Sequence, residues 1–140
     1  MPPSDAQQAA LAANEAFYRA FATRDLTAMT ALWARSVEVA CLHPGWAPLY
    51  GREAVMESWA GILGNPQSPN IRCLQCRVTL KGEVATVVCY EVVEEGYLVA
   101  TNLFVREEGG WKLYHHQAGP LSAETPDPTL PGAAGSKQLH

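Results

Sequence analysis

Residues 101–117 read Thr101-Asn102-Leu103-Phe104-Val105-Arg106-Glu107-Glu108-Gly109-Gly110-Trp111-Lys112-Leu113-Tyr114-His115-His116-Gln117, two runs of alternating apolar and polar residues joined by a Glu-Gly-Gly turn. Alternation with a period of two gives each strand one buried face, and glycine reaches the positive φ of a tight turn at little cost. The stretch therefore predicts a β-hairpin. The hairpin places Asn102 beside the polar cluster 115–117 at the far end of a two-stranded ribbon.

The chain that leads to this hairpin predicts three helices followed by more strands. Apolar residues recur at helical spacing, behind residues suited to cap a helix, over 5–23, 26–33 and 51–63. Alternating or β-branched runs predict strands over 37–42, 71–80, 84–93, 97–106 and 111–118. Helices first and an antiparallel meander afterwards is an α+β pattern. A sheet of this length twists and curls, so we expect a half-open cone that encloses an apolar cavity with the first helix.

Length and composition indicate one domain. The chain has 140 residues, of which 48% are hydrophobic, enough to bury a substantial core. From Pro120 onward it is rich in proline, glycine and alanine and has few large apolar residues, which cannot offset the entropy of ordering. We therefore expect a single domain over 1–119 and a flexible tail over 120–140.

The charge distribution argues against nucleic-acid and membrane partners. The formal net charge is -4, and the ten Lys and Arg residues are scattered singly along the chain. The first residues lack the basic and apolar segments of a signal peptide, and no apolar run approaches the ~20 residues that span a bilayer. We expect a cytoplasmic protein.

The four cysteines suit a reducing environment. Cys41 and Cys89 lie in apolar strand-like runs, where cysteine behaves as a small hydrophobic residue. Cys73 and Cys76 have the C-x-x-C spacing of a redox or zinc motif, with no second such pair and no nearby histidine pair. Because residues three apart in a regular strand face opposite sides, we expect the two thiols to diverge and to hold no metal.

Aromatic residues and a histidine gather around the end of the first expected strand. His43 precedes a Pro-Gly turn in the stretch 43–48, where an imidazole can act as acid or base, or instead bond to backbone carbonyls. Trp46 and Trp59 flank this point in the expected structure. They are candidates for an aromatic wall against a ligand, although tryptophan on a helix face is also common in a core.

Three further polar side chains lie in apolar surroundings. Asn102 occupies a strand of apolar residues, and a buried amide needs a partner or costs roughly 1–3 kcal/mol. Glu91, within another apolar strand, would have a pKa raised by burial and could act as a general base, unless it faces outward. Tyr18, on the first helix, is either a core tyrosine or a donor to a ligand oxygen.

Six motifs stand in a characteristic order between about residues 7 and 119. They are Ala16-Phe17-Tyr18-Arg19-Ala20-Phe21, Arg24-Asp25-Leu26, Leu32-Trp33-Ala34, His43-Pro44-Gly45-Trp46, Gly51-Arg52-Glu53-Ala54-Val55 and Gly110-Trp111-Lys112-Leu113-Tyr114-His115-His116. This order resembles the nuclear transport factor 2-like superfamily and, within it, the SnoaL-like branch. The resemblance implies a cone-shaped α+β barrel, with three N-terminal helices packed on a curved, mainly antiparallel sheet. It also implies a homodimer formed through the outer face of the sheet.

The resemblance bears on the site in two ways. His115 and His116 face opposite sides of the last strand. This strand is similar to the terminal strand of kinase-association domains, in which the position of Ala118 belongs to a pocket. Because residues two apart share a face of a strand, the similarity favours His116 as the inward residue. The only aspartates of the chain are Asp5, Asp25 and Asp127. The aspartate acid or base that similar isomerases and polyketide cyclases place inside the cone is therefore missing.

Because this fold hosts many functions, the activity must be argued from the site. We expect a small hydrophobic ligand with a carbonyl group, and no metal or other cofactor. An isomerase or lyase, of cyclase or dehydratase type, would use Glu91 or His43 as the base, while Asn102, His116 or Tyr18 stabilises the enolate oxygen. The alternative is a non-catalytic dimeric module for ligand binding or association.

Overall fold

The computed structural model describes residues 2–94 and 96–121. The expected tail lies, from residue 122 onward, outside the described residues. The elements are α1 (Asp5–Ala22), α2 (Leu26–Leu32), β1 (Ala40–Leu42), β2 (Leu49–Tyr50), α3 (Arg52–Gly64), β3 (Arg72–Lys81), β4 (Val84–Val93), β5 (Gly96–Glu107) and β6 (Gly110–Pro120). Among the described residues, no helix combines the length and the apolar character needed to cross a membrane.

Local chemistry accounts for the starts of the first two helices. The Ser4 hydroxyl accepts a hydrogen bond from the backbone N–H of Gln7, whose side chain in turn accepts one from the backbone N–H of Ser4, which forms a capping box. The Asp25 carboxylate caps α2 by accepting from the backbone N–H of Ala28 at 3.0 Å. The chain turns sharply between the two helices at Arg24, which has a φ of 55°.

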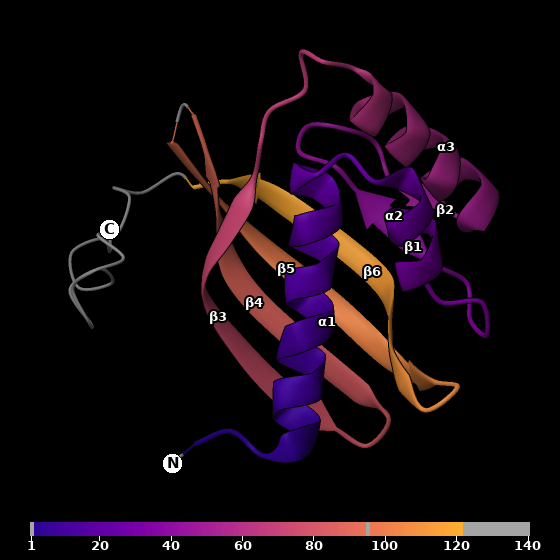
Figure 1. The fold of residues 1–140 in the computed structure, drawn as a ribbon, viewed down its shortest axis with the longest axis vertical. Helices are drawn as coiled ribbons and strands as arrows, with labels where there is room; N and C mark the ends of the chain where they lie inside the picture. Colours follow the sequence, from indigo (N-terminus) through magenta and orange to yellow (C-terminus); the bar gives the residue numbers. More distant parts are fainter. Residues whose placement is uncertain (1, 95, 122–140) are drawn as a thin grey trace.

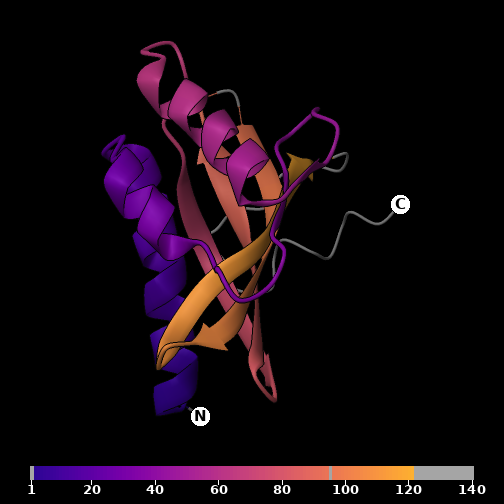
Figure 2. The ribbon, with the colours of Figure 1, turned by 90° about the vertical axis from the view of Figure 1, so that its right-hand side faces the viewer.

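The six strands form one curled sheet in the order β2-β1-β6-β5-β4-β3. The meander β3 to β6 is antiparallel as predicted, and β1 joins it parallel to β6. Figure 1 shows α1 lying across one face of the sheet, and Figure 2 shows α3 beyond one end of that face. Three helices on a curved, mainly antiparallel sheet make a cone-shaped α+β fold, which confirms the predicted fold class.

Around the first strand the structure differs from the sequence-based expectation. The strand expected over 37–42 begins only at Ala40, and β2 was not predicted. The proline-containing stretch forms a turn, in which the backbone N–H of Trp46 donates to the carbonyl of His43 at 2.9 Å. The chain then returns alongside β1, so that Ala40 pairs with Tyr50. A two-residue strand is too short to show a period of two in sequence.

A β-bulge in β3 overturns the expectation that the thiols of Cys73 and Cys76 diverge. The pairing of β3 with β4 shifts register between Leu74 and Arg77, and Gln75 has a φ of 55°. The extra residue changes which face the following side chains occupy. The two sulfur atoms consequently lie 3.5 Å apart.

The core fills the space between α1 and the concave face of the sheet. Its largest fully buried side chains come from helices, loops and strands alike, and include Phe17, Trp33, Trp59, Phe104 and Leu113. Burial of these aromatic and aliphatic groups against the sheet contributes to the driving force for folding. Polar side chains are also buried, and these are Asn14, His43, Glu91, Asn102 and His116.

Candidate functional site

A pocket of about 630 Å³ opens beside α3 and the turn that follows β1. Most of its wall is apolar or aromatic, and its lining includes Phe21, Trp46, Trp59, Ile71, Val93 and Leu98. The polar residues in the wall include His43, Glu91 and His116. An apolar hollow with a few polar groups is the usual form of a small-molecule site.

Glu91 projects from β4 into this wall and is only 2% exposed. Burial raises the pKa of its carboxyl group above 4.5, while a hydrogen bond from the Tyr18 hydroxyl opposes the rise. The Tyr18 O–H donates to Glu91 Oε2 at 2.7 Å. Glu91 is therefore a buried carboxyl group whose ionised form is supported by one strong donor.

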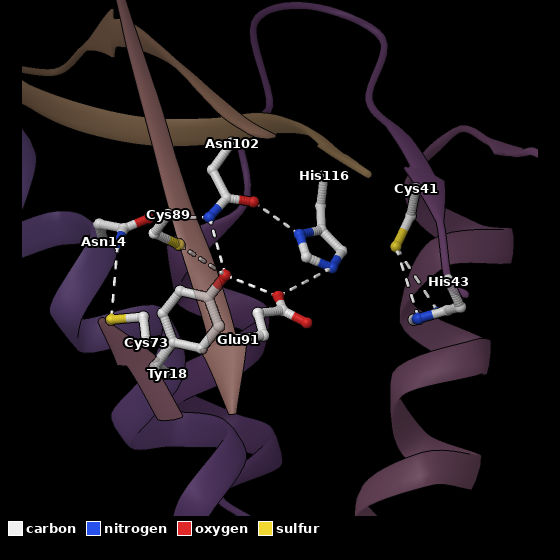
Figure 3. Close-up of polar contacts among 9 residues, drawn as sticks. All are labelled: Asn14, Tyr18, Cys41, His43, Cys73, Cys89, Glu91, Asn102 and His116. Atoms are coloured by element: carbon white, nitrogen blue, oxygen red, sulfur yellow. Dashed lines mark hydrogen bonds and ion pairs between the residues drawn. The ribbon is translucent and has the colours of Figure 1, made fainter. Parts of the chain in front are cut away.

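His116 faces Glu91 from β6, and the hydrogen bonds around it fix its tautomer. Asn102 uses its amide N–H groups to donate to Asn14 Oδ1 at 2.8 Å and to the Tyr18 hydroxyl at 3.1 Å. Asn102 Oδ1 is therefore the acceptor in its 2.6 Å contact with His116 Nδ1, which must carry the proton. The other ring nitrogen, Nε2, lies 3.9 Å from Glu91 Oε2. Figure 3 shows this chain of contacts.

The two histidines of the pocket are neutral at physiological pH. Burial, with smaller contributions from His43 and His115, lowers the pKa of His116 to about 3. Burial likewise lowers the pKa of His43 to about 4. Neutral His116 with its proton on Nδ1 presents a lone pair on Nε2 toward Glu91. Because the pKa of His116 is lowered and that of Glu91 is raised, one added proton resides on the Glu91 carboxyl group, beside a neutral imidazole.

His43 belongs to a second polar group on the opposite side of His116, with the two imidazole rings 6.5 Å apart. The Ser58 hydroxyl donates to the Val55 carbonyl at 2.7 Å, so its oxygen accepts from His43 Nε2 at 3.0 Å. The imidazole also packs edge-on against Trp46 and Trp59. The indoles thus hold His43 in place as well as lining the pocket.

The structure separates the predicted site residues into two sets. Those that line the pocket are His43, Trp46, Trp59, Glu91 and His116. The second set is Tyr18 and Asn102, which lie behind Glu91 and His116 and are tied to them by hydrogen bonds. Trp46 is half exposed at the rim, and Trp59 is fully buried. His115 is half-buried, and His116 is the inward histidine.

Two polar residues that orient side chains of the site were not predicted. Asn14, fully buried on α1, receives the hydrogen bond from Asn102. Its position four residues before Tyr18 was the available signal, because residues four apart share a helix face. Ser58, which orients His43, precedes Trp59 on α3 and had no distinguishing signal in the sequence.

A cone of three helices on a curled sheet, with a pocket at its open end, defines the nuclear transport factor 2-like class of proteins. The sequence matches the SnoaL-like domain family over residues 10–122. The chain belongs to this family.

Two solved structures and one curated protein are similar to the chain. A candidate dehydratase of the nuclear transport factor 2-like family from Streptomyces avermitilis is 33% identical with a TM-score of 0.77, over 84% of this chain and 96% of that one. A candidate calcium/calmodulin-dependent protein kinase type II association domain from Thiobacillus denitrificans is 34% identical with a TM-score of 0.71, over 80% and 94%. The F-box protein SKIP8 of Arabidopsis thaliana is 27% identical over 116 residues, which are 81% of this chain but 50% of that protein. The chain thus spans about half the length of this curated relative.

Proposed function

We propose that the chain binds a small hydrophobic carbonyl compound in the pocket and transfers a proton at the carbon next to the carbonyl group, as an isomerase or lyase of dehydratase type does. The observation that carries this proposal is the placement of Glu91 in the pocket wall, buried, held by Tyr18 at 2.7 Å and facing His116 Nε2 at 3.9 Å. A carboxyl group whose pKa is raised by burial is well suited to general base catalysis.

In the proposed reaction, the Glu91 carboxylate removes a proton from the α carbon of the substrate. The proton then resides on Glu91, beside the Nε2 lone pair of His116, and Glu91 returns it to a different atom of the substrate. Return to the γ carbon of an unsaturated ketone isomerises it, and transfer to a β-hydroxyl group expels water. Both outcomes balance without an external oxidant or reductant, and the apolar wall strengthens the electrostatic contribution of each group.

Tyr18 and Asn102 act in this proposal as positioning residues rather than as ligand contacts. The Tyr18 hydroxyl donates to Glu91, and both amide hydrogens of Asn102 are engaged by Asn14 and Tyr18. The network therefore keeps the Glu91 carboxylate and the lone pair of His116 on the same side of the pocket. His43 remains a second candidate base, oriented by Ser58.

Deuterium exchange tests the proposal without knowledge of the natural substrate. A panel of cyclic and acyclic ketones is incubated with the protein in D₂O, and loss of the α-proton signal is followed by NMR. We expect catalysed exchange with at least one apolar ketone, reduced roughly 10²- to 10⁴-fold by Glu91→Gln and measurably by His116→Gln. In Tyr18→Phe the pKa of Glu91 rises further, so the acid limb of the pH–rate profile moves to higher pH.

The matched control is Glu57→Gln, which removes an exposed carboxylate from the same pocket. This variant should exchange ketone protons like the wild type. Equal losses in Glu57→Gln and Glu91→Gln, or wild-type exchange in Glu91→Gln, would contradict a base role for Glu91.

The second candidate function is a non-catalytic association module. It is favoured by the similarity to the candidate kinase association domain, which is 34% identical over most of both chains. For this function we expect an oligomer in solution and no ketone exchange above the buffer rate. Assembly would then be unchanged in Glu91→Gln and in His116→Gln, because both residues face the pocket rather than the outer surface.

A further inference from the structure

Three of the four cysteines meet outside the pocket wall, between α1 and the edge of the sheet. Cys73 and Cys76 come from β3 and Cys89 from β4, and their sulfur atoms all lie within 4.8 Å of one another. All three are free thiols. The strands that carry them are sequence neighbours in the meander, but the convergence depends on the bulge in β3.

The bulge holds one residue, Gln75, in an unfavourable backbone conformation. Gln75 adopts the left-handed region at a φ of 55°, which is unfavourable for a residue with a β-carbon. Its effect is to place Cys76 on the inner face with Cys73, where a regular strand would have turned it outward. The inner face at this point also carries Cys89, which is 2% exposed.

The spacing of the sulfur atoms suits one shared ion. Metal–sulfur bonds of about 2.3 Å in a trigonal or tetrahedral arrangement separate the sulfurs by about 3.8–4.0 Å. The observed separations, from 3.5 Å for Cys73 and Cys76 up to the limit of 4.8 Å, bracket that value. Small side-chain rotations are enough to close the remaining difference.

The surroundings of the thiols supply one hydrogen-bond donor, the Asn14 amide, and give an ion access. The Asn14 amide N–H donates to Cys76 Sγ at 3.5 Å and to Cys73 Sγ at 3.9 Å, as Figure 3 shows for Cys73. Such donors stabilise metal-bound thiolates from the second coordination layer. Cys73 and Cys76 are only half-buried and lie on an edge strand of the sheet, so an ion can enter from solvent.

We propose that Cys73, Cys76 and Cys89 together bind one thiophilic metal ion, either Cu(I) in three-coordinate form or a divalent ion such as Zn²⁺ with water in the fourth position. Soft thiolate ligands select ions of this class. Each thiol that binds releases its proton to solvent, so no oxidant or reductant is required. Within residues 2–94 and 96–121, the group of potential ligands contains three cysteines and no histidine or carboxylate.

The site is linked to the pocket through one side chain. The Tyr18 hydroxyl lies 3.5 Å from Cys89 Sγ and donates to Glu91. A bound ion would therefore change the charge at Cys89, which shares the Tyr18 hydroxyl as a partner with Glu91. Metal binding itself does not depend on the proposed proton transfer, so the two proposals fail independently.

Titration of the full chain with Cd²⁺, after reduction and under anaerobic conditions, tests the site. We expect a sulfur-to-cadmium charge-transfer band that saturates at one ion per chain, and protection of the two half-buried thiols, Cys73 and Cys76, from iodoacetamide. Cys73→Ser and Cys76→Ser should each weaken binding at least tenfold. Both positions are half-buried on an edge strand, and circular dichroism verifies folding of each variant.

The matched control is Cys41→Ala, which removes the remaining cysteine, located on β1 beside His43. This variant should bind one Cd²⁺ with wild-type affinity. Competition with Zn²⁺ and with buffered Cu(I) then identifies which ion displaces Cd²⁺ at the lower free concentration. Absence of a saturating band, or an equal band in the double variant Cys73→Ser/Cys76→Ser, would overturn the proposal.

Discussion

His43 shows how one buried side chain makes the stability of the whole fold depend on pH. It is buried against Trp46 and Trp59, and burial lowers its pKa to about 4 from the ordinary 6.5. The unfolded chain therefore binds a proton between pH 6.5 and 4 that the folded chain does not bind. The stabilisation is present above pH 6.5 and is lost as the pH falls through this window.

We predict that the free energy of unfolding falls by about 1.4 kcal/mol for each pH unit below 6.5, and by about 2 kcal/mol at pH 5, on account of His43 alone. His116 adds a loss of the same sign, because its pKa is also lowered. Urea denaturation at several pH values measures the slope. His43→Gln, which can still donate to Ser58 but does not titrate, should remove about half of it.

The control for this measurement is Val37→Ala, because Val37 carries no titratable group and is 42% exposed outside the strands. Its slope should match the wild type. A slope in His43→Gln as steep as in the wild type would show that burial of His43 is not the source of the pH dependence.

The buried polar residues that interrupt apolar strands were predictable from the sequence. Glu91 and Asn102 each interrupt a run of strand-forming residues, and both are buried in the structure. Asn14 was missed because short alanine-rich helical segments tolerate a polar residue without any visible break in pattern. The partners of a buried amide are set by tertiary contacts, here 88 residues apart for Asn14 and Asn102, and no local pattern encodes them.

The guanidinium group of Arg24, in the turn between α1 and α2, contacts the C-terminal end of α3 and the loop that follows it. Arg24 donates to the carbonyl groups of Asn65 at 2.9 Å and of Ser68 at 2.6 Å, and makes longer contacts with the last carbonyls of the helix. Asn65 and Ser68 both line the pocket. One side chain therefore satisfies the end of a helix and holds the adjoining loop.

We predict that Arg24→Ala lowers the free energy of unfolding by about 1–3 kcal/mol, because it leaves several partly buried carbonyl groups without their donor. Amide hydrogen exchange over 65–71 should accelerate by a larger factor than exchange elsewhere. Arg24→Lys should recover only part of the loss, since an ammonium group cannot reach two loop carbonyls as a planar fork does.

Arg19→Ala provides the comparison for Arg24→Ala, because Arg19 is an exposed arginine in the last turn of α1. Its effect should stay within about 0.5 kcal/mol, as for most surface substitutions. Equal effects of the two substitutions, or unchanged exchange over 65–71 in Arg24→Ala, would show that the guanidinium does not hold the loop.

At the scale of elements, the strands and helices were predictable, but the bulges were not. The pairing of β5 with β6 shifts register between Leu103 and Phe104, opposite Tyr114. A strict period of two from Leu113 would have turned His115 inward, whereas the shift turns His116 inward instead. The family resemblance indicated His116 as the inward histidine, and the structure agrees. Periodicity alone could not indicate this, because the local composition does not reveal one inserted residue.

At the scale of the whole molecule, the order of helices and strands decided the fold class, and the curl of the sheet produced the pocket. The position of β1 was less predictable, because it pairs parallel to β6, with Ala40 opposite His115, across a sequence separation that no hairpin spans. That pairing carries His43 to the mouth of the cone, next to α3. The site is therefore a product of one long-range strand pairing as much as of its individual residues.

The outer face of the sheet leads to the last prediction, a homodimer formed through that face. Val88 on β4 and Val99 on β5 are diagonal neighbours in register, and they are 41% and 36% exposed. A second copy would cover this apolar surface. We expect sedimentation velocity to give a dimer mass for the wild type and a monomer for Val88→Lys/Val99→Lys. Val37→Lys, at a valine 42% exposed but outside the strands, should remain dimeric. A monomeric wild type, or a double-lysine variant that stays dimeric, would exclude this interface.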